Sequence, residues 1–247
     1  MSEVVQKHYE QLLSRHYSWM IGETIEHKAA EQLALLKALG LGPHLSGTAI
    51  DLGSGPGYQS FALAALGAVH VLAVDTSQGL LDELAKHAGD LPVEGRLADI
   101  RNLRSLCEPG SIECLVCMGD TLTHLPNKSD VIHLIADSFS ALERGGTLVL
   151  TYRDLSQPPE GIDRFIPVRA ENDRIMMCVL DFHPETVTVT DIVHRRDDGD
   201  WRMEKSSYEK LRLPAAWVEK QLTNAGFRVV RNEPAGRMQA VVARKPD

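Results

Sequence analysis

The sequence predicts an α/β fold in which a seven-stranded, mostly parallel sheet carries helices on both faces. Short apolar runs alternate with stretches of helical spacing as far as about residue 155, an order typical of parallel sheets. A glycine-rich turn follows the first of these runs, and beyond residue 155 the period changes to that of antiparallel strands. At 247 residues, the chain is long enough for one such domain with additions.

Two helices are expected ahead of the first strand, over residues 3–20 and 24–39. The first contains the aromatic residues Tyr17 and Trp19, which on an amphipathic helix would cover the edge of the sheet. The second ends at Gly40. Its apolar residues lie near one stripe: Ile25, Ala29, Leu33, Leu36 and Leu39.

The most informative segment is the run Ala-Ile-Asp-Leu-Gly-Ser-Gly-Pro-Gly over residues 49–57. An apolar strand ends in Asp51, and a turn with three glycines follows it. Glycine permits positive φ and has no Cβ, so a ligand can approach the backbone closely. A second apolar strand over residues 69–74 ends in Asp75. This order is typical of a Rossmann-like nucleoside-binding βαβ unit.

The glycine spacing is G-x-G-x-G, whereas the dinucleotide fingerprint is G-x-G-x-x-G. Asp51 would repel a pyrophosphate but attract a ligand with an ammonium group. Nicotinamide-dependent oxidoreduction therefore fits the strand-end acids but not the glycines. The simplest alternative is a turn that only packs a helix against a strand, with Asp75 as the cap of the next helix.

Further strands are expected over residues 93–97 and 112–118, and the loop 119–126 follows the second of them. The segment 142–150 predicts a helix that a glycine pair stops before a fifth strand. The strands at 227–231 and 238–244 complete the sheet.

The segment Asp-Leu-Gly-Ser-Gly-Pro-Gly resembles motif I of the class I S-adenosylmethionine-dependent methyltransferases, and the later strands follow in the order of that family. The resemblance covers about residues 45–155. It implies that S-adenosylmethionine is the cofactor, that Asp75 binds the ribose hydroxyls, that Asp99 lies beside the adenine amino group, and that the N-terminal helices form a lid. The cofactor-binding residues expected are Asp51, Gly53, Ser54, Gly55, Gly57, Asp75, Thr76, Asp99, Ile100, Met118 and Tyr17.

A narrower resemblance lies in the loops that should face the methyl group. The segments 117–126 and 150–154 are similar to those of glycine and sarcosine N-methyltransferases. The resemblance implies that Arg153 clamps an acceptor carboxylate and that His124 borders the reacting amine. Asp120 stands where that family has a neutral asparagine, so glycine itself is not expected as the acceptor, although an acceptor with an anionic group remains reasonable.

The chemistry expected of these residues is modest, since positioning can supply several kcal/mol of a methyl-transfer barrier. His124 could accept the proton of an amine, because its ordinary pKa is about 6.5. Asp120 could instead hold an ammonium or hydroxyl donor. The alternatives are a loop histidine that caps a helix or bonds to backbone, and an Arg153 that forms a surface ion pair with Asp154 or Glu160.

Beyond residue 155, alternation over 173–195 and a further candidate over 201–213 predict three antiparallel strands in a meander. A helix from Pro214 to Asn224 follows. We expect one methyltransferase domain with four parts. These are the N-terminal helices (1–44), the cofactor-binding core (45–155), the antiparallel substrate-side insertion (156–213), and the last helix with the closing strands (214–247).

The composition of the chain restricts the classes of partner that the protein is expected to bind. The net charge is −8 and no basic stripe is visible, which argues against nucleic acid. Nothing resembles a membrane span or an export signal, so a cytoplasmic protein is expected. Cys114 and Cys117 form a C-x-x-C spacing, but within a strand they point to opposite faces and predict no metal site. A small-molecule acceptor and a monomer or homodimer are expected. The alternative function is a sensor that binds the cofactor or its demethylated product without turnover.

Overall fold

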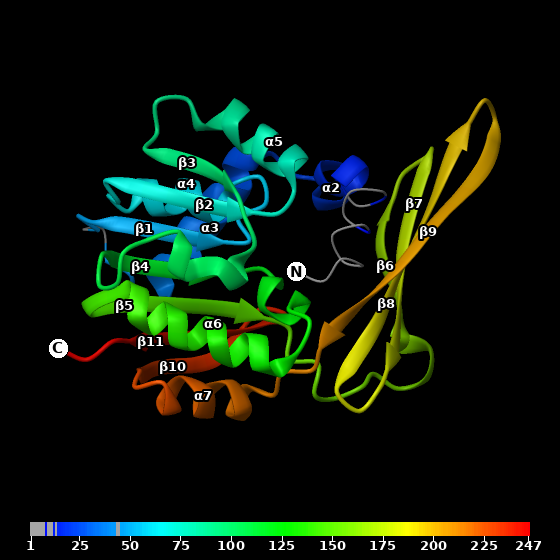
Figure 1. The fold of residues 1–247 in the computed structure, drawn as a ribbon. Helices are drawn as coiled ribbons and strands as arrows, with labels where there is room; N and C mark the ends of the chain where they lie inside the picture. Colours follow the sequence, from blue (N-terminus) through cyan, green and yellow to red (C-terminus); the bar gives the residue numbers. More distant parts are fainter. Residues whose placement is uncertain (1–7, 9–11, 13, 43–44) are drawn as a thin grey trace.

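The computed structural model describes residues 8, 12, 14–42 and 45–247. Its larger sheet has the order β10-β11-β5-β4-β1-β2-β3, in which β11 runs antiparallel to both of its neighbours and the other pairs are parallel (Figure 1). The chain progresses outward in one direction from β1 to β3 and in the other through β4 and β5, so the sheet has a topological switch point between β1 and β4. The strands are β1 (Thr48–Leu52), β2 (His70–Asp75), β3 (Val93–Leu97), β4 (Ile112–Cys117), β5 (Leu142–Tyr152), β10 (Arg228–Ala235) and β11 (Met238–Arg244).

Helices cover both faces of this sheet, as expected (Figure 1). On one face, Leu36 of α3 and Leu63 of α4 are fully buried in one apolar cluster. On the other, Leu134 of α6 and Val218 of α7 join a second cluster. The helices are α2 (Ser14–Ile21), α3 (Ile25–Ala38), α4 (Tyr58–Ala65), α5 (Gln78–Ala88), α6 (Lys128–Ala141) and α7 (Ala215–Asn224), with short 3-10 turns η2 (Ile100–Ser105), η3 (Thr121–His124) and η4 (Gly161–Arg164).

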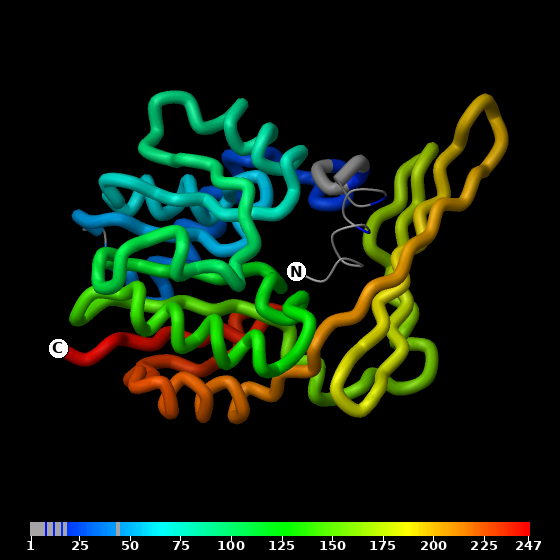
Figure 2. Tube along the Cα trace, viewed as in Figure 1, coloured from blue at the N-terminus to red at the C-terminus, as the bar shows by residue number. Residues whose placement is uncertain are grey.

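A second, antiparallel sheet stands beside the carboxyl ends of the parallel strands (Figure 1). Its strands, in spatial and sequence order, are β6 (Phe165–Ala170), β7 (Arg174–Phe182), β8 (Thr186–Asp197) and β9 (Asp200–Leu211). Val187, Val189 and Tyr208 are buried on the face turned toward the main sheet. The hairpin of β8 and β9 extends well past the other strands (Figure 2).

Two expectations about local structure were wrong. The meander has four strands rather than three. The additional strand, β6, was not expected because it contains Pro167 and shows no regular alternation of buried and exposed residues. The segment 142–144 belongs to β5, since α6 already ends at Ala141. The glycine pair lies at an irregularity in the pairing of β4 with β5, where a Cβ on Gly146 would meet the carbonyl oxygen of Glu143 at 2.9 Å. The last part of the helix expected over 3–20 corresponds to α2. The first part of that segment lies largely outside the described residues.

Candidate active site

The glycine turn links β1 to α4 at the carboxyl ends of the parallel strands. Gly53 has φ +76°, and a Cβ there would lie 2.3 Å from the side chain of Thr121 in the loop after β4. The N–H groups of Gly53 and Ser54 both donate to the carbonyl oxygen of Val74, at 2.8 and 3.0 Å. That of Gly57 donates to the carbonyl oxygen of Ser54. The protein therefore uses these donors itself, and the turn offers a ligand close approach rather than free N–H groups.

A cavity opens between this turn and the loops after β2, β3 and β4. It encloses about 280 Å³ of empty space, part of it open to solvent. Its position at the carboxyl ends of the strands is the one expected for a ligand site in an open α/β sheet. The lining residues are Gly53, Asp75, Thr76, Ile100, Thr121, His124 and Leu125.

Asp75 holds the turn in place from the end of β2. One carboxylate oxygen accepts from the N–H of Gly55 at 2.9 Å and the other from that of Ser77 at 2.8 Å. Burial raises the pKa of Asp75, and these backbone hydrogen bonds oppose the rise. Each carboxylate oxygen has a second lone pair, so two further donors can still bind.

Asp51 lies deeper, at 1% exposure. The Ser60 hydroxyl on α4 donates to its Oδ2 at 2.7 Å, whereas its Oδ1 has no hydrogen-bond partner among the described residues. Burial, together with repulsion from Asp75, raises the pKa of Asp51 to about 7. A buried carboxylate with one unsatisfied oxygen favours a ligand that donates a hydrogen bond or carries a positive charge.

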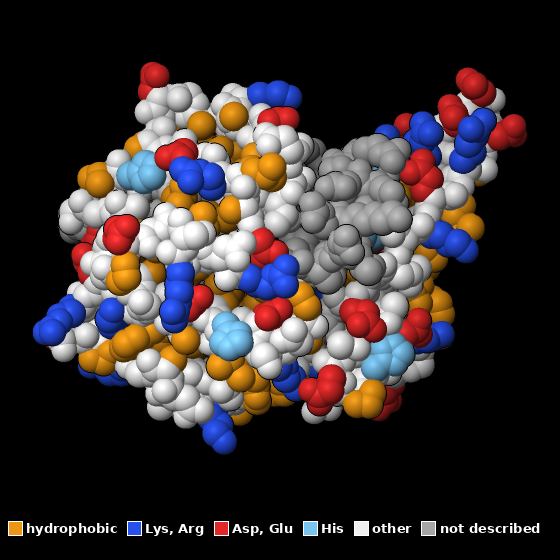
Figure 3. Space-filling model, in the orientation of Figure 1, with side chains coloured by type: hydrophobic (Ala, Val, Ile, Leu, Met, Phe, Trp, Pro, Cys, Tyr) orange, Lys and Arg blue, Asp and Glu red, His pale blue; other side chains and the backbone are white. Residues whose placement is uncertain are grey.

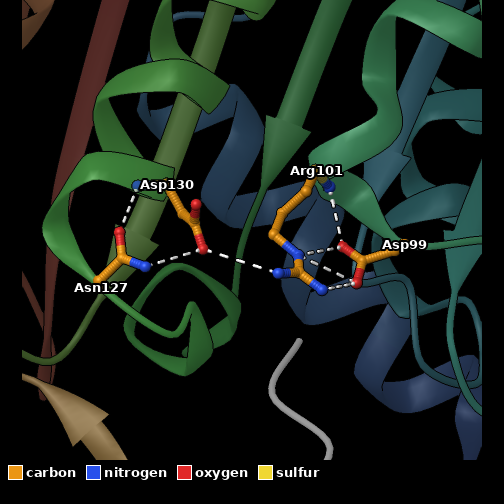
Figure 4. Close-up of polar contacts among 4 residues, drawn as sticks. All are labelled: Asp99, Arg101, Asn127 and Asp130. Carbon is orange, nitrogen blue, oxygen red and sulfur yellow. Dashed lines mark hydrogen bonds and ion pairs between the residues drawn. The ribbon is translucent and has the colours of Figure 1, made fainter.

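Asp99 does not line the cavity, but it is fixed in position next to Ile100, which does. Figure 4 shows the guanidinium of Arg101 donating hydrogen bonds to both carboxylate oxygens of Asp99. The Nη2 of Arg101 lies 2.7 Å from the Oδ2 of Asp99. The same guanidinium reaches Asp130 at 3.7 Å, beside the cap of α6 at Asn127. Burial would raise the pKa of Asp99, but the hydrogen bonds from Arg101 hold it well below its usual range. The carboxylate is therefore ionised and fixed in direction, next to the lining residue Ile100.

Of two other expected cofactor residues, one lies away from the cavity and the side chain of the other is outside the described structure. Met118 is buried in the apolar cluster between the main sheet and α3 and α4, and it does not line the cavity. The backbone of Tyr17 belongs to α2, but its side chain lies outside the described part of the structure.

The loop after β4 is the one expected to face the acceptor. Asp120 is 13% exposed at its side chain, and its Oδ2 accepts from the ammonium of Lys210 on β9 at 2.5 Å. Its Oδ1 accepts from the backbone N–H of Arg153 at 3.0 Å and from the Thr123 hydroxyl at 3.1 Å. Burial opposes ionisation, but Lys210 and the other nearby positive groups lower the pKa of Asp120 to about 2.

His124 is buried and lines the same cavity as the glycine turn. The ring of Tyr208 stacks on it at 5.2 Å between centroids and 14° between planes. Burial and the Lys210 ammonium lower the pKa of His124 to about 3. The imidazole is therefore uncharged at neutral pH, but it is a weaker base than the sequence led us to expect.

Arg153 follows β5 and is exposed. Among the described residues it forms no ion pair with Asp154 or Glu160, the partners of the surface alternative. Asp154 instead accepts from the backbone N–H groups of Ser156 and Ala215, at 2.8 and 3.0 Å. The guanidinium is thus exposed and close enough to Asp120 to help lower the pKa of that carboxyl.

Sequence reasoning missed several residues of the site. Thr121 and Leu125 belong to the segment already singled out, and their position between Asp120 and Pro126 was the available signal. Lys210 carries no local signal, and Tyr208 was a candidate for the roof of the pocket that spacing alone could not place, because only the packing of β9 against the loop brings them to the site. The same holds for His8, whose Nε2 lies 3.0 Å from the carboxylate of Asp191 on β8.

The remaining groups with possible chemistry lie apart from the cavity. Cys114 and Cys117 are fully buried in different apolar clusters on opposite faces of the sheet, as predicted, and burial raises both thiol pKa values. Among the described residues, only the exposed Glu23, His27 and Glu31 on or beside α3 could together approach a metal ion.

Positive and negative side chains intermingle on the face in Figure 3, and Arg195 and Arg202 lie within 3.7 and 3.6 Å of Asp197 at the hairpin tip. No helix in the described ranges is long and apolar enough to cross a membrane.

Comparison with known proteins agrees with this geometry. Residues 49–146 match a family model described as a methyltransferase domain. No curated protein sequence matches the chain. Among solved structures, an S-adenosylmethionine-dependent methyltransferase from Clostridium acetobutylicum superposes with a TM-score of 0.75 at 15% identity, over 97% of this chain and 99% of that one.

Two further structures have a TM-score of 0.71. The CcbJ methyltransferase from Streptomyces caelestis is 21% identical over 87% of this chain and 89% of its own. CalS10 from Micromonospora echinaspora, an amino pentose methyltransferase solved with S-adenosylmethionine bound, is 16% identical over 94% and 95%. The narrower resemblance to glycine and sarcosine N-methyltransferases stays a prediction. Residues 49–146 thus match a methyltransferase domain, and the chain as a whole shares the fold of solved S-adenosylmethionine-dependent methyltransferases.

Proposed function

We propose that the protein transfers the methyl group of S-adenosylmethionine to a nitrogen or oxygen atom of a small-molecule acceptor. One observation carries this proposal: the glycine turn, the strand-end acid Asp75 and the loop histidine His124 line a single cavity. A cofactor bound along the turn would thus have its reactive end within the same space as the acceptor loop.

The residues present fit this cofactor. The unsatisfied Oδ1 of Asp51 and the absence of a Cβ at Gly53 favour a positively charged group close to the turn. Asp75 has lone pairs left for two vicinal hydroxyls. When bound, S-adenosylmethionine supplies a methyl group already activated by its sulfonium.

The protein's own part in the reaction is positioning. The acceptor's lone pair forms the new bond to the methyl carbon, the carbon–sulfur bond breaks with its electron pair left on sulfur, and the acceptor's proton leaves to solvent. His124 would receive a hydrogen bond from the acceptor and orient its lone pair, which is a role that an uncharged imidazole can fill. Arg153, exposed at the rim, would pair with an anionic group on the acceptor where there is one.

The test has two stages. Calorimetry with S-adenosylhomocysteine and with NAD should show heat for the first ligand only. Protein incubated with methyl-labelled S-adenosylmethionine is then given small acceptors, beginning with amino sugars because an amino pentose methyltransferase shares the fold, followed by amino acids and hydroxy acids. Label should pass to one class of them. Binding without transfer across the whole set would favour the sensor function, and absence of binding would contradict both.

A further inference from the structure

The antiparallel sheet contributes two side chains to the active site. Tyr208 and Lys210 are two residues apart on β9, so they point from the same face of the strand, and both are buried. Tyr208 stacks on His124, and Lys210 pairs with Asp120. The two contacts hold the loop after β4 at Asp120 and at His124.

This arrangement leaves the Asp120 carboxylate with little unbalanced charge to attract an acceptor ammonium. The carboxylate accepts hydrogen bonds from Lys210, from the backbone of Arg153 and from Thr123. The first two donors belong to β9 and to the chain just after β5, so Asp120 is the point at which three separate segments meet. Its negative charge is already matched by one buried positive charge.

Four described residues near His124 bear on its charge. Asp120 belongs to its own loop, Tyr208 and Lys210 belong to β9, and His8 approaches from the N-terminal segment, with its ring 4.3 Å from that of Tyr208. Lys210 is the only member of this set with a permanent positive charge at neutral pH. Its proximity opposes a proton on the imidazole.

We propose that Lys210 is a positioning residue of the active site, whose ammonium group anchors and neutralises Asp120 beside His124, so that the site selects an uncharged nucleophile. This inference rests on the proposed function and names the form of its substrate. An amine would bind as the free base or an alcohol as the hydroxyl, with His124 as hydrogen-bond acceptor. An ammonium ion would find no unmatched carboxylate on this side of the cavity.

The test follows the imidazole of His124 by NMR titration of the histidine carbon-bound protons, with H124N to assign the signal. Neither cofactor nor acceptor is needed, so failure of the proposed function does not affect the result. In Lys210→Met the His124 pKa should rise by about one unit or more, the usual effect of a charge at this range. In Asp120→Asn it should fall, and in the double variant Asp120→Asn/Lys210→Met it should lie between those of the two single variants.

Lys205→Met is the matched control, because Lys205 lies on the same strand but is exposed on the opposite face. It should leave the titration unchanged. A His124 titration that is the same in wild type and Lys210→Met would overturn the proposal. Should Lys210→Met not fold, the comparison of Asp120→Asn with the double variant measures the same contribution of Lys210, and equal titrations there would overturn it.

The substrate form has its own readout. For an amine acceptor found by the labelled-methyl screen, the transfer rate at subsaturating acceptor should rise with pH in proportion to the free-base fraction. A rate that instead follows the ammonium fraction would contradict the selection of an uncharged nucleophile.

Discussion

The two halves of the active site both bury carboxylates, but they balance the charge differently. On the cofactor side, Asp51 and Asp75 bond to a hydroxyl and to backbone N–H groups, with no cationic side chain paired to either among the described residues. On the acceptor side, Asp120 pairs with Lys210, and Asp191 lies 3.0 Å from the imidazole of His8.

This difference indicates what each half requires of its ligand. A buried carboxylate without a positive partner is costly, and a ligand that brings a positive charge relieves that cost. The cofactor side thus favours a sulfonium and an ammonium group. On the acceptor side the Asp120 carboxylate already has a cationic partner, so it gains little from a charged nucleophile.

Removal of the cation on the acceptor side should have the largest effect. Lys210→Met leaves the Asp120 carboxylate buried without its partner, which should lower the free energy of unfolding by about 3–5 kcal/mol. The double variant Asp120→Asn/Lys210→Met removes both charges and should regain most of that loss. Urea denaturation of the variants measures both values. A double variant no more stable than the single one would show that charge balance is not the reason for the pair.

The cofactor side should respond to pH in a way that the acceptor side does not. The pKa of Asp51 is raised to about 7 in the fold, whereas in the unfolded chain it is about 3.9. As pH rises from about 4 to 7, the unfolded chain loses this proton while the folded protein keeps it, so Asp51 makes the protein less stable. Asp51→Asn removes this penalty, and its advantage over wild type should grow by about 2–4 kcal/mol over that range.

The shifted pKa of His124 changes stability with pH in the opposite direction from that of Asp51. The pH dependence of the free energy of unfolding therefore distinguishes the two halves of the site. Its folded pKa of about 3 lies below the ordinary value near 6.5, so its contribution is complete above pH 6.5 and is lost as pH falls toward 3. Urea denaturation at several pH values should therefore show Asp51→Asn diverging from wild type toward neutral pH. A constant difference between the two proteins would mean that Asp51 is not buried as a protonated acid.

The cofactor side could be predicted from sequence because its determinants are local. The glycine turn, Asp51 and the strand-end Asp75 fall within 27 consecutive residues, and the βαβ topology alone brings Asp75 to the turn. Even there, the sequence did not show that the N–H groups of the turn would be used within the protein.

The acceptor side could be predicted only in part, since it forms by contact between distant segments. The loop residues Asp120 and His124 were found by resemblance, but Lys210 lies 90 residues further on in a strand whose register no local pattern fixes. A one-residue slip of β9 would turn Lys210 and Tyr208 to the outer face. The basicity of His124 was overestimated for the same reason, because burial and Lys210 both arise from this packing.

Asp75 tests the cofactor side directly. Asp75→Ala removes the acceptor for two ribose hydroxyls and should raise the Kd for S-adenosylhomocysteine about 10- to 100-fold, or about 1.4–2.8 kcal/mol, by calorimetry. Asp82→Ala, which removes an exposed carboxylate of α5, is the control and should leave the Kd unchanged. If Asp75→Ala binds the ligand as tightly as wild type does, the ribose role must be given to another residue.

Arg153 should have the smallest effect, because its guanidinium is exposed and solvent weakens its attraction for an anion. For a carboxylated acceptor, Arg153→Ala should raise KM about three- to tenfold, or roughly 1 kcal/mol, and leave kcat almost unchanged, since the charge acts equally on the bound acceptor and on the transition state. Arg144→Ala, at the opposite end of β5, should change neither constant. For an acceptor without an anionic group, KM and kcat should be the same in both variants as in wild type. If KM for a carboxylated acceptor does not respond to Arg153→Ala, then the rim of the site does not select for charge, and the acceptor side discriminates only through the uncharged nucleophile beside His124.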